Sequence, residues 1–92
     1  MIVRIASEGQ FEIADGLADE LNALDNRCVE VVDAGDEQGF HAAYDAMLRF
    51  VRDNGTELEA HELVGSSLIL PPADLSFAEA GEQFNGDGLI PD

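Results

Sequence analysis

Three side chains of this sequence are candidates for catalysis or metal binding: Cys28, the one cysteine, and the two histidines, His41 and His61. A catalytic histidine needs a nucleophile beside it and an acid that orients its ring. A zinc site needs several Cys or His ligands at defined spacing. A cysteine is a nucleophile only as a thiolate, which nearby cations stabilise. What these three residues can do therefore depends on their neighbours.

Neither histidine has the neighbours that catalysis requires. His41 follows Phe40 in a predicted helix but lies off its apolar stripe, so we expect it at the surface. His61 stands near Glu59 and Glu62 in a polar segment, which leaves a metal site there as an alternative. No histidine pair four residues apart and no cysteine pair supports that site.

Cys28 lies on the apolar stripe of another predicted helix, where a cysteine behaves as a small hydrophobe. Arg27 precedes it but points about 100° away around a helix. The negative surroundings raise the pKa of a thiol. We expect Cys28 to be buried and unreactive, and a single cysteine excludes an intramolecular disulfide.

Other chemical motifs are weak. Residues 85–88 (NGDG) are similar to half a calcium loop but lack the later ligands and the closing glutamate, so we predict a turn. No glycine pattern for phosphate binding occurs. Among 20 acidic residues, no carboxylate pair stands out as a general acid and base. We therefore predict no catalytic residue, no metal site and no cofactor, and we do not expect an enzyme.

The net charge is −16, from 20 Asp and Glu against four basic residues, all of them Arg. Self-repulsion of this size opposes folding unless salt screens it. The acid excess without Lys resembles proteins of halophilic archaea, with a calcium-binding surface as the alternative. Four scattered Arg cannot displace the counterions of a phosphate backbone, which argues against binding to nucleic acid or to an anionic lipid surface.

Ninety-two residues predict one domain, residues 1–92, with a modest core. A pocket of about 300 Å³ or more is hard to accommodate in so small a core. No apolar window approaches the 18 or more residues of a membrane span, and the first residues do not fit a signal peptide. We expect no membrane insertion and a cytoplasmic location.

Apolar periodicity predicts the elements. Alternation over 2–6 and 11–13 predicts a β-hairpin. A stripe from Leu17 to Val31 predicts a helix over 15–34, with Asp15 as its N-cap and Gly35 just after its end.

A second helix is predicted from its cap Asp36 to Asn54, antiparallel to the first because so few residues separate them. Residues 56–66 show no period. Residues 67–70 predict a third strand, since a two-stranded ribbon alone would be marginal. Ser76 and Glu79 match a capping box, which predicts a short helix to about Phe84.

The resulting fold class is α+β: a small, mostly antiparallel sheet packed on an αα-hairpin plus a short C-terminal helix. Two apolar segments lie outside the long helices, and either they complete the core or they form an exposed patch or open strand edge for a protein partner. The candidate partner-binding residues are Leu68, Ile69, Leu70, Pro71, Pro72, Leu89, Ile90 and Pro91.

Four stretches carry a family resemblance through their order and spacing. They are residues 1–5 (MIVRI) followed by 8–11 (EGQF), 19–26 (DELNALDN), 62–64 (ELV) through 70–76 (LPPADLS), and 88–91 (GLIP). This pattern resembles the small PspA-associated domain, a companion of phage-shock protein A, from end to end.

The resemblance implies an accessory or regulatory protein-binding module of a phage-shock-type membrane-stress system, with phage-shock protein A (PspA) as the implied partner. Two other functions stay open. The helical hairpin could pair with a second copy to form a homodimer. Less favoured is a small-ligand or metal sensor with a pocket between sheet and hairpin.

The acidity leads to a prediction about salt. We expect the free energy of unfolding to fall as potassium chloride is lowered from molar to millimolar, because repulsion among the carboxylates is then unscreened. Denaturant titration followed by circular dichroism at the two concentrations measures this. Equal stability at both would show that the acidic surface is not an adaptation to salt.

Overall fold

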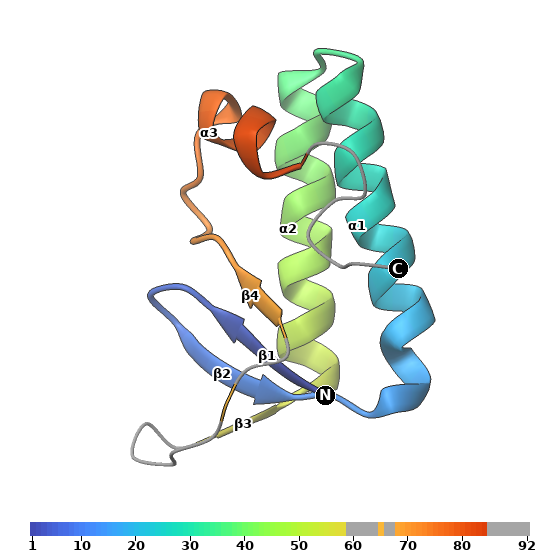
Figure 1. The fold of residues 1–92 in the computed structure, drawn as a ribbon, viewed down its shortest axis with the longest axis vertical. Helices are drawn as coiled ribbons and strands as arrows, with labels where there is room; N and C mark the ends of the chain where they lie inside the picture. The colour runs from blue at the N-terminus through green and yellow to red at the C-terminus, as the bar shows by residue number, and fades with distance from the viewer. Residues whose placement is uncertain (59–64, 66–67, 85–92) are drawn as a thin grey trace.

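The computed structural model describes residues 1–58, 65 and 68–84. Two long helices run side by side, and a small sheet and a short helix lie against them (Figure 1). In chain order the elements are β1 (Ile2–Ile5), β2 (Gly9–Glu12), the 3₁₀ turn η1 (Asp15–Leu17), α1 (Ala18–Asp33), α2 (Glu37–Asn54), β3 (Thr56–Glu57), β4 (Leu68–Leu70) and α3 (Phe77–Gln83).

The described sheet has four strands in the order β3-β2-β1-β4. β1 pairs antiparallel with β2, β2 antiparallel with β3, and β1 parallel with β4. The predicted α+β class, with a mostly antiparallel sheet, a helical hairpin and a short third helix, is confirmed. β3 was not predicted, because its two residues are both exposed and carry no apolar signal.

The turn between α1 and α2 has the predicted chemistry. Gly35 adopts φ +72°, a conformation open to glycine at little cost. Its N–H donates to Val32 and the N–H of Asp36 donates to Val31, which is the Schellman pattern. The Asp36 carboxylate then accepts the N–H of Gly39 at 2.9 Å and caps α2. Asp36 thus takes part both in the end of α1, through its N–H, and in the cap of α2, through its carboxylate. The chain therefore reverses direction within a few residues.

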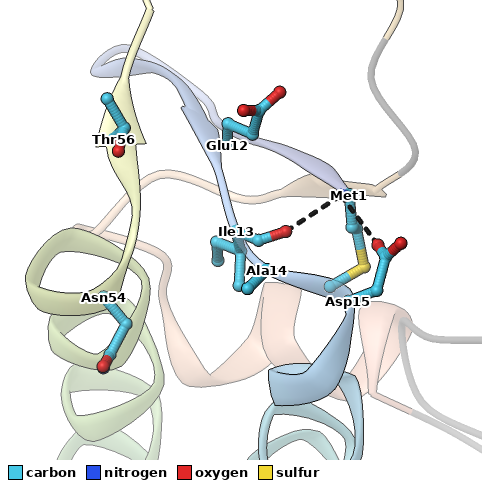
Figure 2. Close-up of a pocket in the computed structure, with 7 residues that line it drawn as sticks. All are labelled: Met1, Glu12, Ile13, Ala14, Asp15, Asn54 and Thr56. Carbon is cyan, nitrogen blue, oxygen red and sulfur yellow. Dashed lines mark hydrogen bonds and ion pairs between the residues drawn. The ribbon is translucent and has the colours of Figure 1, made fainter.

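The predicted N-cap role of Asp15 is wrong. α1 begins at Ala18 after the turn η1, and no side chain caps either of these two elements. The Asp15 carboxylate instead contacts the amino group of Met1 at 3.1 Å, and that group also donates to the carbonyl of Ile13 at 2.9 Å (Figure 2). A cation that β1 brings close is a stronger partner for a carboxylate than backbone N–H groups alone.

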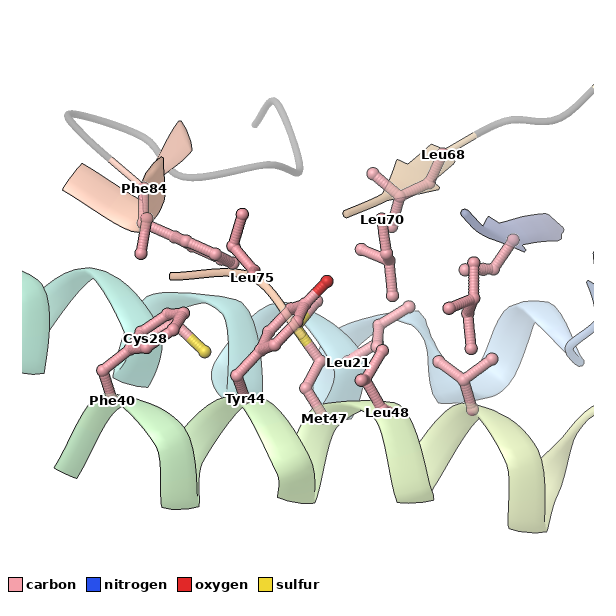
Figure 3. Close-up of a cluster of buried hydrophobic side chains, with 14 of the residues drawn as sticks. Leu21, Cys28, Phe40, Tyr44, Met47, Leu48, Leu68, Leu70, Leu75 and Phe84 are labelled. Atoms are coloured by element: carbon pink, nitrogen blue, oxygen red, sulfur yellow. The ribbon is translucent and has the colours of Figure 1, made fainter. Parts of the chain in front are cut away.

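The core lies between one face of the sheet and the hairpin. The stripe predicted from Leu17 to Val31 is buried at Leu21, Cys28 and Val31, whereas Leu17 and Leu24 are partly buried. On α2 the buried residues are Phe40, Tyr44, Met47, Leu48 and Val51. From the sheet, Val3, Ile5, Phe11, Leu68 and Leu70 meet them. Figure 3 shows Leu70 pointing from β4 toward the hairpin.

Aromatic rings attach α3 to α2. The Phe40 ring lies 5.5 Å from both the Tyr44 ring and the Phe84 ring, measured between centroids. Edge-to-face and offset-stacked pairs at this distance add stability beyond the area they bury. The predicted capping box is present, with Ser76 and Glu79 each accepting the other's backbone N–H. α3 is therefore held both by its own cap and by the cluster beneath it.

Two glycines test the packing. A Cβ on Gly55 would lie 2.6 Å from the Val51 carbonyl oxygen and 2.9 Å from the Phe11 Cβ, whereas one on Gly81 would meet no atom within 4 Å. We expect Gly55→Ala to lower the free energy of unfolding by about 1–3 kcal/mol through overpacking. Gly81→Ala, within α3, should raise it by about 0.5–1 kcal/mol. Urea denaturation of both variants measures these changes. If Gly55→Ala raised the free energy of unfolding as Gly81→Ala does, then α2 and β2 would not be in close contact at Gly55.

Candidate functional site

The segment around β4 contains all five of the predicted partner-binding residues that the structure describes, residues 68–72. Leu68 and Leu70 face the hairpin and are buried, at 8% and 0% exposure. Ile69, between them, is 62% exposed, and among the described residues it is the one large apolar side chain exposed to this degree. The sequence left two interpretations of this segment, core residues or an exposed patch for a partner, and each applies to different residues. Leu68 and Leu70 complete the core, whereas the exposed Ile69 can contact a partner.

The prolines that follow are half-buried, and the rest of the prediction lies elsewhere. Pro71 and Pro72 follow the strand and cannot donate to a strand ladder, because proline has no backbone N–H. Leu89, Ile90 and Pro91 lie outside the described residues, so their role stays a prediction.

β4 is the outermost strand on its side of the described sheet. The carbonyl of Leu70 accepts the N–H of Ala6 at 2.9 Å, so the polar groups of Leu70 face β1. Along a strand these groups alternate in direction, so the N–H and C=O of Ile69 point away from β1. Within the described part of the chain, this edge pairs with no further strand.

A recess of about 270 Å³ adjoins this edge, between β4 and α3. We call it the β4 recess. Its walls are mostly apolar, with one carboxylate and one amide from α3. The lining residues are Ala6, Ile69, Leu70, Pro71, Pro72, Leu75, Glu79 and Gln83.

Tyr44 holds the β4 recess in place. Its hydroxyl donates a hydrogen bond to the carbonyl of Pro71, and its ring belongs to the aromatic cluster with Phe40 and Phe84. Burial, with the nearby Cys28 and Glu8, raises the pKa of the Tyr44 phenol, so the phenol remains a donor. Because proline has a fixed φ, a wall built from Pro71 and Pro72 on this anchor is rigid.

The family of the chain follows from comparison with known proteins. The model of the family described as PspA-Associated protein matches residues 1–92. The chain belongs to the PspA-associated protein family. The family description associates its members with PspA, a protein partner. No curated protein and no solved structure matches significantly.

The described helices of this PspA-associated protein include none that is long and apolar enough to cross a membrane. A second recess, of about 490 Å³, lies where the strand ends meet η1 (Figure 2). The sequence predicted little room for a pocket of about 300 Å³ or more within so small a core, and this open recess does not test that prediction. This recess is a notch in the surface between elements, so it requires no volume from the core.

The reactive side chains that the structure describes, Cys28 and His41, do not line the β4 recess. His41 is at the surface, as predicted, with its ring edge-on to Phe40. Cys28 is fully buried, also as predicted. Burial, and then the charge of Asp25, raise the pKa of its thiol to about 12. His61 and residues 85–88 lie outside the described residues, and no three His, Cys, Asp or Glu side chains within the described part are grouped to hold a metal.

The Cys28 thiol predicts a loss of stability in base. The fold raises the pKa from 9.0 to about 12, so above pH 9 the thiol ionises in the unfolded chain but not in the folded one. The stability is complete below pH 9, and this one group should lower the free energy of unfolding by about 1.4 kcal/mol from pH 8 to pH 10. Urea denaturation of the wild type and Cys28→Ala at both pH values measures this. An equal loss in the two proteins would contradict the assignment.

Proposed function

We propose that this chain is a non-enzymatic accessory protein of a phage-shock-type membrane-stress system, a protein-binding module that engages PspA through Ile69 and the β4 recess. The observation that carries the proposal is the exposure of Ile69, at 62%, beside buried Leu68 and Leu70. Family membership over residues 1–92 supplies the expected partner.

The surroundings of Ile69 suit a binding surface. Covering a large exposed apolar side chain removes apolar surface from water and so contributes favourable free energy to binding. A few such residues anchor an interface. Pro71 and Pro72 are held by Tyr44 before any partner arrives, so little conformational entropy is lost on binding. Ile69 and the recess can thus anchor a partner without rearranging the fold.

The non-enzymatic part of the proposal is supported by the positions of the reactive groups. The Cys28 thiol is buried and neutral at ordinary pH, and His41 lies at the surface near Asp45, lining a different depression. None of these side chains lines the β4 recess. Binding there requires shape and apolar contact rather than proton transfer.

Replacement of Ile69 tests the proposal. We expect Ile69→Asp to weaken binding to purified PspA of the same genome by at least about 10-fold, because it places a charge where apolar surface should be covered. Isothermal titration calorimetry in molar potassium chloride gives the affinity. Ala46→Asp adds the same charge at an exposed site on α2 and should bind as the wild type does.

Two further measurements complete this test. Circular dichroism should show both variants folded, since each substituted residue is exposed. Size-exclusion mass of the wild type separates binding of PspA from self-assembly. An equal loss of affinity in the two variants, or no binding of wild type to PspA, would contradict the proposed function.

A further inference from the structure

One face of the sheet is left uncovered by the described elements. Residues alternate along the strands, so the side chains between the buried Val3, Ile5 and Phe11 point away from the hairpin. In Figure 1 the hairpin lies on one side of the sheet. We call the opposite side the open sheet face; its residues are Ile2, Arg4, Ala6, Gln10, Glu12, Thr56 and Ile69.

Arg4 is distinct among the four arginines. The other three each contact a carboxylate, whereas the Arg4 side chain is exposed and forms no hydrogen bond or ion pair with any described residue, despite the net charge of −16. The pairs of the other three are Arg27–Glu30 at 3.3 Å, Arg49–Asp45 at 3.1 Å and Arg52–Glu8 at 2.6 Å.

Arg4 lies beside Ile69, the large apolar side chain that is most exposed among the described residues. In the strand register Arg4 lies opposite Gln10 on β2 and opposite Ile69 on β4. A guanidinium binds a carboxylate through two parallel hydrogen bonds, and it does so best where neighbouring apolar groups exclude water. Arg4 and Ile69 together therefore fit a partner surface that presents a carboxylate next to apolar side chains.

The dimensions of the face indicate what kind of partner covers it. β1 and β2 have four residues each, β4 has three and β3 has two, so with strands about 4.8 Å apart the face measures on the order of 13 Å by 14 Å at its widest. A stable protein–protein interface buries about 800 Å² on each side, much more than this face offers. A single α-helix, with side chains about 10–12 Å across, fits it. The face thus suits one helix rather than the sheet of a second copy.

We propose that the open sheet face binds an amphipathic helix whose carboxylate pairs with Arg4 while flanking apolar residues cover Ile69. The bound helix adds a third layer to the two-layer fold. The identity of the partner as PspA rests on the proposed function, whereas the chemistry of the helix rests on the open sheet face itself. The competing explanation is that Arg4 only prevents exposed strands from associating with each other.

The test uses two synthetic helical peptides that differ in one residue. Both carry leucines four residues apart; one has Glu between them and the other has Lys. Each is titrated into the full ¹⁵N-labelled chain, with backbone amide and Arg side-chain shifts as the readout. We expect the Glu peptide to shift signals of Arg4, Gln10 and Ile69 and to bind at least fivefold more tightly than the Lys peptide.

Matched variants show whether Arg4 makes the selection. We expect Arg4→Glu to abolish the preference for the Glu peptide, and Arg49→Glu, the same charge change on α2, to keep it. Equal binding of both peptides, no shifts on the open sheet face, or a preference unchanged in Arg4→Glu would overturn the proposal. So would an Arg4→Gln variant that retains the preference but self-associates, since Arg4 would then be protective.

Titration of PspA into the same variants separates this inference from the proposed function. If the Glu peptide binds as expected and PspA does not bind the wild type, then the chemistry of the face stands and PspA is not the partner. If PspA binds and Arg4→Glu binds it as tightly as Arg49→Glu does, then the proposed function stands and the assignment of Arg4 fails.

Discussion

The described structure depends on one constraint: the α1–α2 hairpin packs against only one face of the four-stranded sheet. Val3, Ile5 and Leu70 are fully buried against that hairpin, while their strand neighbours Arg4 and Ile69 are exposed. A sheet of this kind always has two faces, and burial of one is enough to stabilise it. Arg4 and Ile69, two side chains that suit a partner, lie on the side that the hairpin does not cover.

The geometry of the β4 recess is set from inside the core. Tyr44 stacks on Phe40 and donates to the carbonyl of Pro71, so the same side chain that packs α3 also fixes the chain beyond β4. The turn at Gly35 and Asp36 aligns α2 with α1, and this alignment places Tyr44 within reach of the Pro71 carbonyl. A surface built in this way is preorganised, which lowers the conformational entropy lost on binding.

The charge distribution combines a general and a local effect. The net charge of −16 produces a negative field that keeps molecules apart and steers cationic partners. Contacts such as that of Arg52 with Glu8, which joins the β1–β2 turn to the last part of α2, use most of the few cations within the molecule. Arg4 is the exception, and it lies where the apolar surface is also exposed. The local chemistry of the open sheet face therefore differs from that of the surface as a whole.

The sequence by itself determined the elements whose cause is local. Helical periodicity, the glycine at position 35, the cap at Asp36 and the box at Ser76 act within a few residues, and all are present as predicted. Tertiary structure decided the rest. β3 forms because β2 offers an edge, and Asp15 binds Met1 because β1 brings that amine near. The pairing of β4 with β1 places Leu68 and Leu70 on the face that the hairpin covers and Ile69 on the other face. These contacts join residues far apart in the chain, and no local pattern encodes which edge or charge will lie nearby.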